Sequence, residues 1–110
     1  MQQGEIFYAN LNPTRGKEQR GVRPVLIISG NAMNNYMGVV IVCPLTSKIK
    51  HYAGCVVLKK DKINNLSEDS EIITFQVRVI SKVRMTKKIG HITPEKFREL
   101  IIGLNEILKY

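Results

Sequence analysis

The chain has 110 residues, which predicts one domain over residues 1–110 with a core of modest size that a dimer would extend. Seventeen lysines and arginines oppose nine acidic residues, and this net charge of +8 favours a polyanionic partner. No apolar run is long enough to span a bilayer, and the first residues lack the pattern of a signal peptide. We therefore expect a cytoplasmic protein.

In chain order, the sequence predicts several strands followed by one helix. Short segments rich in β-branched residues predict strands over residues 6–11, 22–29, 39–45, 55–59 and 72–80, separated by Asn, Gly and Pro clusters. Thr93, Pro94 and Glu95 supply an N-cap, a first-turn proline and a first-turn acid, so a helix should follow. Its apolar residues recur at three- and four-residue spacing, forming one face that packs on the sheet or across a dimer: Phe97, Leu100, Ile101, Leu104 and Leu108. This pattern is typical of a mainly β fold, a small antiparallel barrel or sandwich, with a C-terminal helix.

The residues that could hold a metal or act as a nucleophile form no familiar pattern. Cys43 and Cys55 lie in apolar runs at a spacing that fits neither a redox motif nor a zinc site, which predicts two buried, reduced thiols. The acidic cluster at residues 68–71 resembles a turn leading into a strand. His51 and His91 could serve as an acid–base pair, although an exposed or capping histidine is the commoner outcome. No metal or other cofactor is expected.

The basic excess is confined to the β-rich part of the chain. Three basic and three acidic residues cancel within residues 93–110, so residues 1–92 carry the whole net charge. The basic residues form three clusters, at residues 15–23, 48–62 and 78–88. Such a field attracts RNA phosphates, and it would equally attract an acidic disordered peptide. A solvated surface that only confers solubility is the alternative.

The Arg23-Pro24 pair holds an arginine at the rim of the predicted sheet. Proline disfavours the helical conformation in the residue before it and belongs at a strand start or edge. The guanidinium of Arg23 is therefore placed where a loop enters a rigid strand, a position that suits anion recognition. An ordinary surface arginine paired with Glu18 is the alternative.

Five segments occur in the order found in the MazF/PemK family of toxin endoribonucleases, which the chain resembles from residue 4 to about residue 85. They are Gly4-Glu5-Ile6, Leu11-Asn12-Pro13, Gly16-x-Glu18-Gln19-x-Gly21-x-Arg23-Pro24-Val25-Leu26, Pro44-Leu45-Thr46-Ser47 and Gln76-Val77-Arg78-x-Ile80. The resemblance implies a small SH3-like β-barrel of the CcdB/MazF type that forms a homodimer. It also implies metal-independent cleavage of single-stranded RNA and inhibition by an acidic antitoxin with a disordered tail.

The same resemblance implies which residues perform the reaction. The family's catalytic arginine and threonine correspond to Arg23 and Thr46, and Glu18 is a candidate to orient the arginine or a ribose. Attack by the RNA 2′-hydroxyl needs stabilisation of charge on the phosphate and movement of two protons, which these residues can assist. The general base stays open. The residues expected to contact RNA are Lys17, Gln19, Arg20, Asn31, Asn34, Ser47, Lys48, Gln76 and Arg78.

Some features set limits on the resemblance. A plasmid-borne branch of the family uses a histidine, an arginine and an aspartate where this chain has Lys17, Ile73 and Phe75, so that mechanism does not apply. Phe75 is expected in the core, and Tyr36 and Tyr52 are better candidates to stack on bases. Gyrase-poisoning toxins of the same fold use a tryptophan near the C-terminus, and this chain has none. A non-catalytic RNA-binding barrel would not need both the Arg-Pro and the Pro-x-Thr motifs.

Overall fold

The structure is a computed structural model that describes residues 1–12 and 21–109. The predicted site residues Lys17, Glu18, Gln19 and Arg20 therefore lie outside the described residues. The elements are β1 (Glu5–Asn10), β2 (Val22–Ile27), α1 (Asn31–Tyr36), β3 (Val39–Thr46), β4 (Val56–Leu58), β5 (Ser70–Ile72), η1 (Thr74–Gln76), β6 (Arg78–Ser81), η2 (Lys82–Arg84), β7 (Met85–His91) and α2 (Pro94–Leu108). The prediction of a mainly β fold with a C-terminal helix is confirmed.

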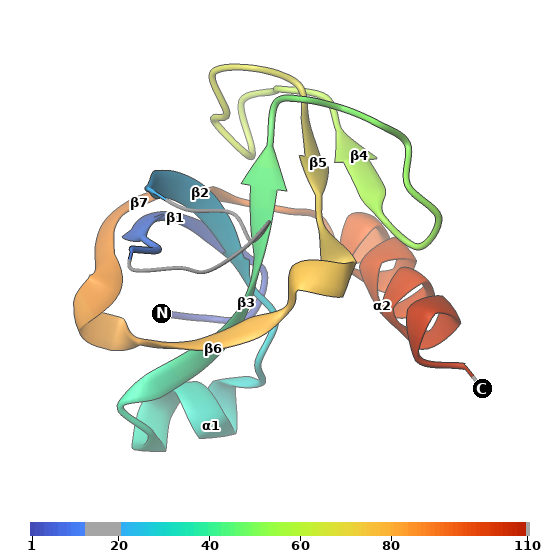
Figure 1. The fold of residues 1–110 in the computed structure, drawn as a ribbon. Helices are drawn as coiled ribbons and strands as arrows, with labels where there is room; N and C mark the ends of the chain where they lie inside the picture. Colours follow the sequence, from blue (N-terminus) through green and yellow to red (C-terminus); the bar gives the residue numbers. More distant parts are fainter. Residues whose placement is uncertain (13–20, 110) are drawn as a thin grey trace.

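The strands pair in the order β4-β5-β3-β2-β1-β7, and β6 pairs with β3. The long strand β3 is shared between two parts of the molecule, because its first half pairs with β6 and its last two residues pair with β5. Figure 1 shows the resulting barrel-like curl of β1, β2, β3, β6 and β7, with β5 and β4 extending from the end of β3 and α2 lying beside them. The end of β3 thus stands where the curled sheet and the β4–β5 extension meet.

The hydrophobic core explains why the central strands contain long apolar runs. In β2, Val25 and Ile27 belong to one buried cluster and Leu26 belongs to another, because successive strand residues point to opposite faces of the sheet. One cluster fills the inside of the curl, and the other lies on the far face with β4, β5 and Leu100 of α2. With both faces buried, β2 is held rigidly, and so is the Arg23-Pro24 junction at its start.

Several predicted boundaries differ from the structure. The segment 72–80 is not one strand, because the one-turn helix η1 separates β5 from β6. The helix α1 occupies a segment rich in asparagine that was expected to be a loop. The strand β7 was missed because three successive exposed polar residues, Thr86, Lys87 and Lys88, interrupt the apolar alternation that is typical of a strand.

The predicted start of the C-terminal helix is confirmed. The Thr93 hydroxyl accepts a hydrogen bond from the backbone N–H of Lys96 at 3.3 Å, and Pro94 lies in the first turn. Phe97, Leu100 and Leu104 pack on the core as expected. Ile101 and Leu108 are 39% and 70% exposed, so the apolar face of the helix is broader than the surface that covers it in the monomer. In the described part of the chain, no helix is long and apolar enough to cross a membrane.

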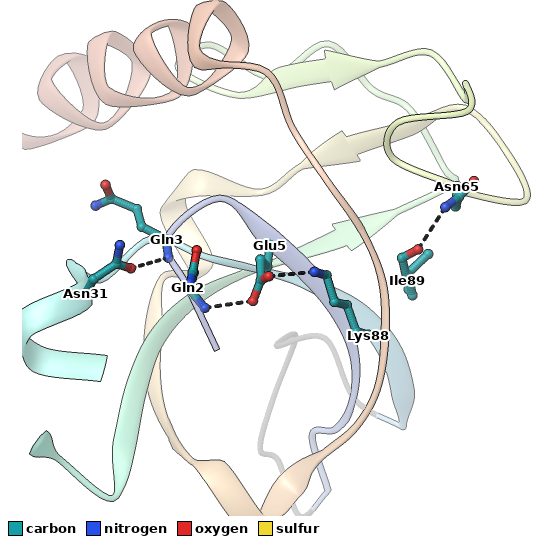
Figure 2. Close-up of polar contacts among 7 residues, drawn as sticks. All are labelled: Gln2, Gln3, Glu5, Asn31, Asn65, Lys88 and Ile89. Carbon is teal, nitrogen blue, oxygen red and sulfur yellow. Dashed lines mark hydrogen bonds and ion pairs between the residues drawn. The ribbon is translucent and has the colours of Figure 1, made fainter. Parts of the chain in front are cut away.

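Polar contacts tie the N-terminal segment to elements distant in the sequence (Figure 2). The backbone N–H of Gln3 donates to Asn31 Oδ1 at 2.8 Å, and Lys88 Nζ lies 2.7 Å from the Glu5 carboxylate. Burial raises the pKa of Glu5, but its hydrogen bonds and the charge of Lys88 outweigh this effect, so the pKa lies below its ordinary value. These contacts join α1 to the segment before β1 and join β7 to β1.

Of the two cysteines, only Cys43 is fully buried. Cys55 is partly buried and lies 3.5 Å from the Thr74 hydroxyl, so the expectation of two buried thiols was wrong for this residue. Both thiols are free.

Candidate active site

Thr46 is the last residue of β3 and lies at the floor of a hollow of about 290 Å³. Its side chain is only 7% exposed, and its Oγ1 atom accepts a hydrogen bond from the backbone N–H of Lys48 at 3.2 Å. Because the hydroxyl oxygen is the acceptor in this contact, the hydroxyl keeps its own proton for donation. The strand therefore presents an oriented hydroxyl group to whatever enters the hollow.

The hollow above Thr46 combines cationic and aromatic side chains. It is lined by Thr46, Lys48, Lys50, Tyr52, Ile73, Phe75 and Gln76. The rings of Tyr52 and Phe75 meet edge to face with their centroids 5.2 Å apart, and both residues are about half exposed. The expectation that Phe75 lies in the core was therefore wrong. Lysines suit phosphate groups, and exposed aromatic faces suit unstacked bases, so this surface fits single-stranded RNA.

Arg23 lies in β2, opposite Ala9 of β1, and is half-buried. It lines a second hollow of about 160 Å³ together with Ser47, Glu68 and Ser70. The β2–β3 ladder pairs Val25 with Pro44. Arg23 precedes Val25 by two residues and Thr46 follows Pro44 by two, so both lie at the same end of these two antiparallel strands. The two motifs that the sequence separates by more than twenty residues thus converge at one end of β3.

Three of the other predicted contact residues line the two hollows, and a fourth, Arg78, lies on β6. Lys48 and Gln76 line the hollow with Thr46, and Ser47 lines the hollow with Arg23. Arg78 begins β6, opposite Val42 of β3, and is half-buried.

Asn31 and Asn34 belong to α1, beside the start of β3 and far from Thr46 (Figure 1). Since β3 has eight residues, its two ends lie about 23 Å apart at roughly 3.3 Å per residue. Asn34 is 2% exposed, and its amide bonds with the hydroxyl and the carbonyl of Ser29. Asn31 accepts from the N–H of Gln3. The structure therefore separates both asparagines from the site, and their side chains stabilise the fold around α1.

The site also contains a buried acid that the sequence analysis treated as part of a turn. Glu71 of β5 is fully buried and pairs with Thr46 across the β3–β5 ladder. Its carboxylate accepts hydrogen bonds from the backbone N–H groups of Lys50, His51 and Tyr52, at 2.8, 3.2 and 2.9 Å. The available signal was the position of this acid directly before the apolar residues Ile72 and Ile73, since a carboxylate that is buried beside them needs partners.

The histidines and acidic residues of the described part of the chain are dispersed. Within residues 1–12 and 21–109, no three His, Cys, Asp or Glu side chains gather closely enough to hold a metal ion. His51 lies in the exposed loop after β3. His91 ends β7 and lines a separate, mostly apolar hollow with Ile63 and Lys96. The structure therefore gives no support to the alternative of a histidine acid–base pair.

Residues 2–108 match the family described as PemK-like, MazF-like toxin of type II toxin–antitoxin system. The chain belongs to this toxin family. It is 34% identical over 102 residues to the endoribonuclease MazF of Staphylococcus saprophyticus, a match that covers 91% of this chain and 84% of that protein. The fold is similar to crystal structures of MazF-family toxins. MazF from Deinococcus radiodurans gives a TM-score of 0.85 at 26% identity, covering 98% of this chain and 96% of that one. A MazE–MazF structure from the same organism gives 0.78 at 25% identity, covering 98% and 95%.

Proposed function

We propose that this MazF-family chain is the toxin of a type II toxin–antitoxin system and acts as a sequence-specific endoribonuclease on single-stranded RNA. The observation that carries the proposal is the convergence of Arg23 and Thr46 at one end of β3, beside a hollow lined by lysines and aromatic rings. Family membership and the relationship to a MazF endoribonuclease support the same activity.

The reaction begins with attack of the RNA 2′-hydroxyl on the adjacent phosphorus atom. The bond from phosphorus to the 5′-oxygen breaks, which leaves a 2′,3′-cyclic phosphate and a 5′-hydroxyl. Arg23 holds the phosphate and stabilises the charge that builds on its equatorial oxygens, because a guanidinium donates two parallel hydrogen bonds in fixed geometry. The 2′-hydroxyl loses one proton as it attacks and the departing 5′-oxygen gains one, while Thr46 donates a hydrogen bond from its hydroxyl to the phosphate or to the departing oxygen. Glu18 is assigned to orient Arg23 or the ribose.

The nucleotides next to the cleaved bond are assigned to the hollow above Thr46. Lys48 and Lys50 are assigned to neutralise phosphates, and the rings of Tyr52 and Phe75 are assigned to stack against one base. Gln76 is assigned to read a base edge, and Ser47 and Arg78 are assigned to further RNA contacts. Lys17, Gln19 and Arg20, which precede β2 in the sequence, are assigned to the same RNA.

The regulatory partner is proposed to be an acidic antitoxin whose disordered tail folds across this basic surface. Such a peptide places carboxylates where RNA places phosphates and apolar side chains where bases stack, so antitoxin and RNA should compete. A homodimer in the cytoplasm completes the proposal, and the exposed apolar residues Val79, Ile101 and Ile102 are consistent with a further protein contact. Sedimentation at several concentrations would test the dimer.

The test uses a defined pool of single-stranded RNAs incubated with the purified protein in excess EDTA. We expect cleavage at a short recognition sequence, with products that carry 5′-hydroxyl and 2′,3′-cyclic phosphate ends. An absolute requirement for Mg²⁺ would contradict the mechanism. Binding of the RNA without cleavage would favour the non-catalytic barrel, and inhibition of gyrase without RNA cleavage would favour the other toxin class of this fold.

A further inference from the structure

The loop between β3 and β4, residues 47–55, supplies Lys48, Lys50 and Tyr52 to the hollow above Thr46. It contains no regular secondary structure, and most of its residues are exposed. A loop of this kind would sample many conformations and lose that freedom on binding RNA, which weakens affinity. Its backbone is nevertheless held from beneath by side chains of the β5–η1 segment.

The first anchor is the carboxylate of Glu71. Oε1 accepts from the N–H groups of Lys50 and His51, and Oε2 accepts from the N–H of Tyr52. His51 has a φ of 55°, and this left-handed residue turns three successive N–H groups toward one point. Successive N–H groups arranged in this way form a concave site for an anion. Here the anion belongs to the protein itself and fixes the middle of the loop.

The second anchor holds the far end of the same loop. The Thr74 hydroxyl donates to the carbonyl oxygen of Gly54 at 2.8 Å, and Thr74 is fully buried. Gly54 also packs against Gly103 of α2, so closely that a Cβ atom at Gly103 would lie 2.1 Å from the Gly54 oxygen. The loop is therefore fixed at its middle and at its end before any RNA arrives.

We propose that Glu71 is a positioning residue for RNA binding, which sets the loop 47–55 so that Lys50 and Tyr52 face Phe75 across the hollow. This inference rests on the proposed function and names a residue that touches no substrate. The β5–η1 segment performs two tasks through different residues. Glu71 and Thr74 point inward and hold the loop, while Phe75 and Gln76 line the hollow.

Only a carboxylate can satisfy this arrangement. Replacing Glu71 with glutamine keeps the size of the side chain but leaves one acceptor oxygen and an NH₂ group, which is a donor. If the amide oxygen faces Lys50 and His51, the NH₂ group faces the N–H of Tyr52, and two donors oppose each other. The reverse orientation leaves two N–H groups without an acceptor. We expect Glu71→Gln to release the loop and to weaken RNA binding by about tenfold.

The experiment compares Glu71→Gln with Asp69→Asn in binding an RNA that carries a 2′-deoxy sugar at the cleaved position. Asp69 is the matched control, because its exposed carboxylate also accepts a backbone N–H, that of Lys60 at 2.9 Å, but in a different loop. Glu71→Gln should bind RNA about tenfold more weakly and raise KM, with kcat at saturating RNA kept within about threefold. Asp69→Asn should match the parent. Equal RNA affinity of the Glu71→Gln variant and the parent would overturn the proposal.

Two further measurements separate positioning from a general loss of structure. In a Tyr52→Ala background, Glu71→Gln should weaken RNA binding by a smaller factor than in the parent, because the Tyr52 ring that Glu71 positions is already absent. The same factor in both backgrounds would overturn the proposal. In the parent protein, the amides of Lys50, His51 and Tyr52 should resist hydrogen exchange before RNA is added and should keep that protection with RNA bound.

The proposal would also be overturned if these amides exchanged at the rates of an unstructured chain in the free protein and became protected only with RNA bound. This measurement needs no variant. The outcome is distinct from a failure of the proposed function. If the parent does not cleave RNA, the function is wrong. If the parent cleaves RNA but the three amides are unprotected, or Glu71→Gln binds normally, only the role of Glu71 is wrong.

Discussion

Replacing Thr46 with valine removes one hydroxyl group and changes the shape of the side chain very little. Thr46 is 7% exposed, and its Oγ1 atom accepts a hydrogen bond from the backbone N–H of Lys48. Because Lys48 lies in an exposed loop, water can replace this acceptor, and the variant should lose about 0.5–1 kcal/mol of stability. The thermal midpoint should fall by about 5 °C or less. Cleavage should fall by about 10²–10³-fold, which corresponds to about 2.7–4 kcal/mol of transition-state stabilisation.

The assay is single-turnover cleavage of a labelled RNA at saturating protein, combined with the affinity for the same RNA carrying a 2′-deoxy sugar. The control is Thr86→Val, because the Thr86 hydroxyl donates to the carbonyl of Tyr8 at 3.1 Å on the exposed strand β7. Thr86→Val should cleave at the parental rate. The reasoning would be refuted if Thr46→Val cleaved within about threefold of the parent, or if its loss of rate matched a loss of RNA affinity.

Three more predictions follow from the site and the packing. Arg23→Ala should lower the cleavage rate by at least about a hundredfold in the same assay, and Arg23→Lys should not restore it, since a lysine cannot hold a phosphate through two parallel hydrogen bonds. A normal cleavage rate in either variant would remove Arg23 from the site. The logarithm of the RNA binding constant should fall linearly with the logarithm of the salt concentration, and Lys48→Ala or Lys50→Ala should each reduce the magnitude of this slope by about 0.7. An unchanged slope would mean that the lysine contacts no phosphate. Gly103→Ala should lower the free energy of unfolding by about 1–3 kcal/mol in denaturant titration, because the added Cβ would meet the Gly54 oxygen, whereas at Gly38 the added Cβ meets no atom and stability should not change. Equal stability of the two variants would contradict this packing.

The sequence predicted the strand positions of Arg23 and Thr46 better than the surface around them. Arg23 lies in β2 and Thr46 ends β3, as their motifs indicated, while their catalytic roles stay predictions. Asn31 and Asn34 were expected to contact RNA, and the structure separates them from the site. No local pattern reveals that α1 lies at the opposite end of β3, because that depends on the pairing of β3 with β6 and β5.

The errors at Phe75 and Glu71 share one physical cause. The segment 72–80 was predicted as one strand with Phe75 in the core, and the acids at residues 68–71 were interpreted as a turn before it. The one-turn helix η1 reverses this pattern by turning Phe75 outward and Thr74 inward. The partners of Glu71 are backbone N–H groups about twenty residues earlier in the chain. Every residue except proline carries such a group, so the residue types in the sequence do not reveal these partners.

The central claim is that the RNA supplies the nucleophile while Arg23 and Thr46 stabilise its attack. The most direct test follows two RNA oligonucleotides of one sequence, which differ only by a 2′-deoxy sugar at the cleaved position, in excess EDTA. The account predicts equal binding of both, complete cleavage of the ribose form to a 2′,3′-cyclic phosphate, and no cleavage of the deoxy form. Cleavage of the deoxy form, or products with a 5′-phosphate, would show that the nucleophile comes from elsewhere and would contradict the account.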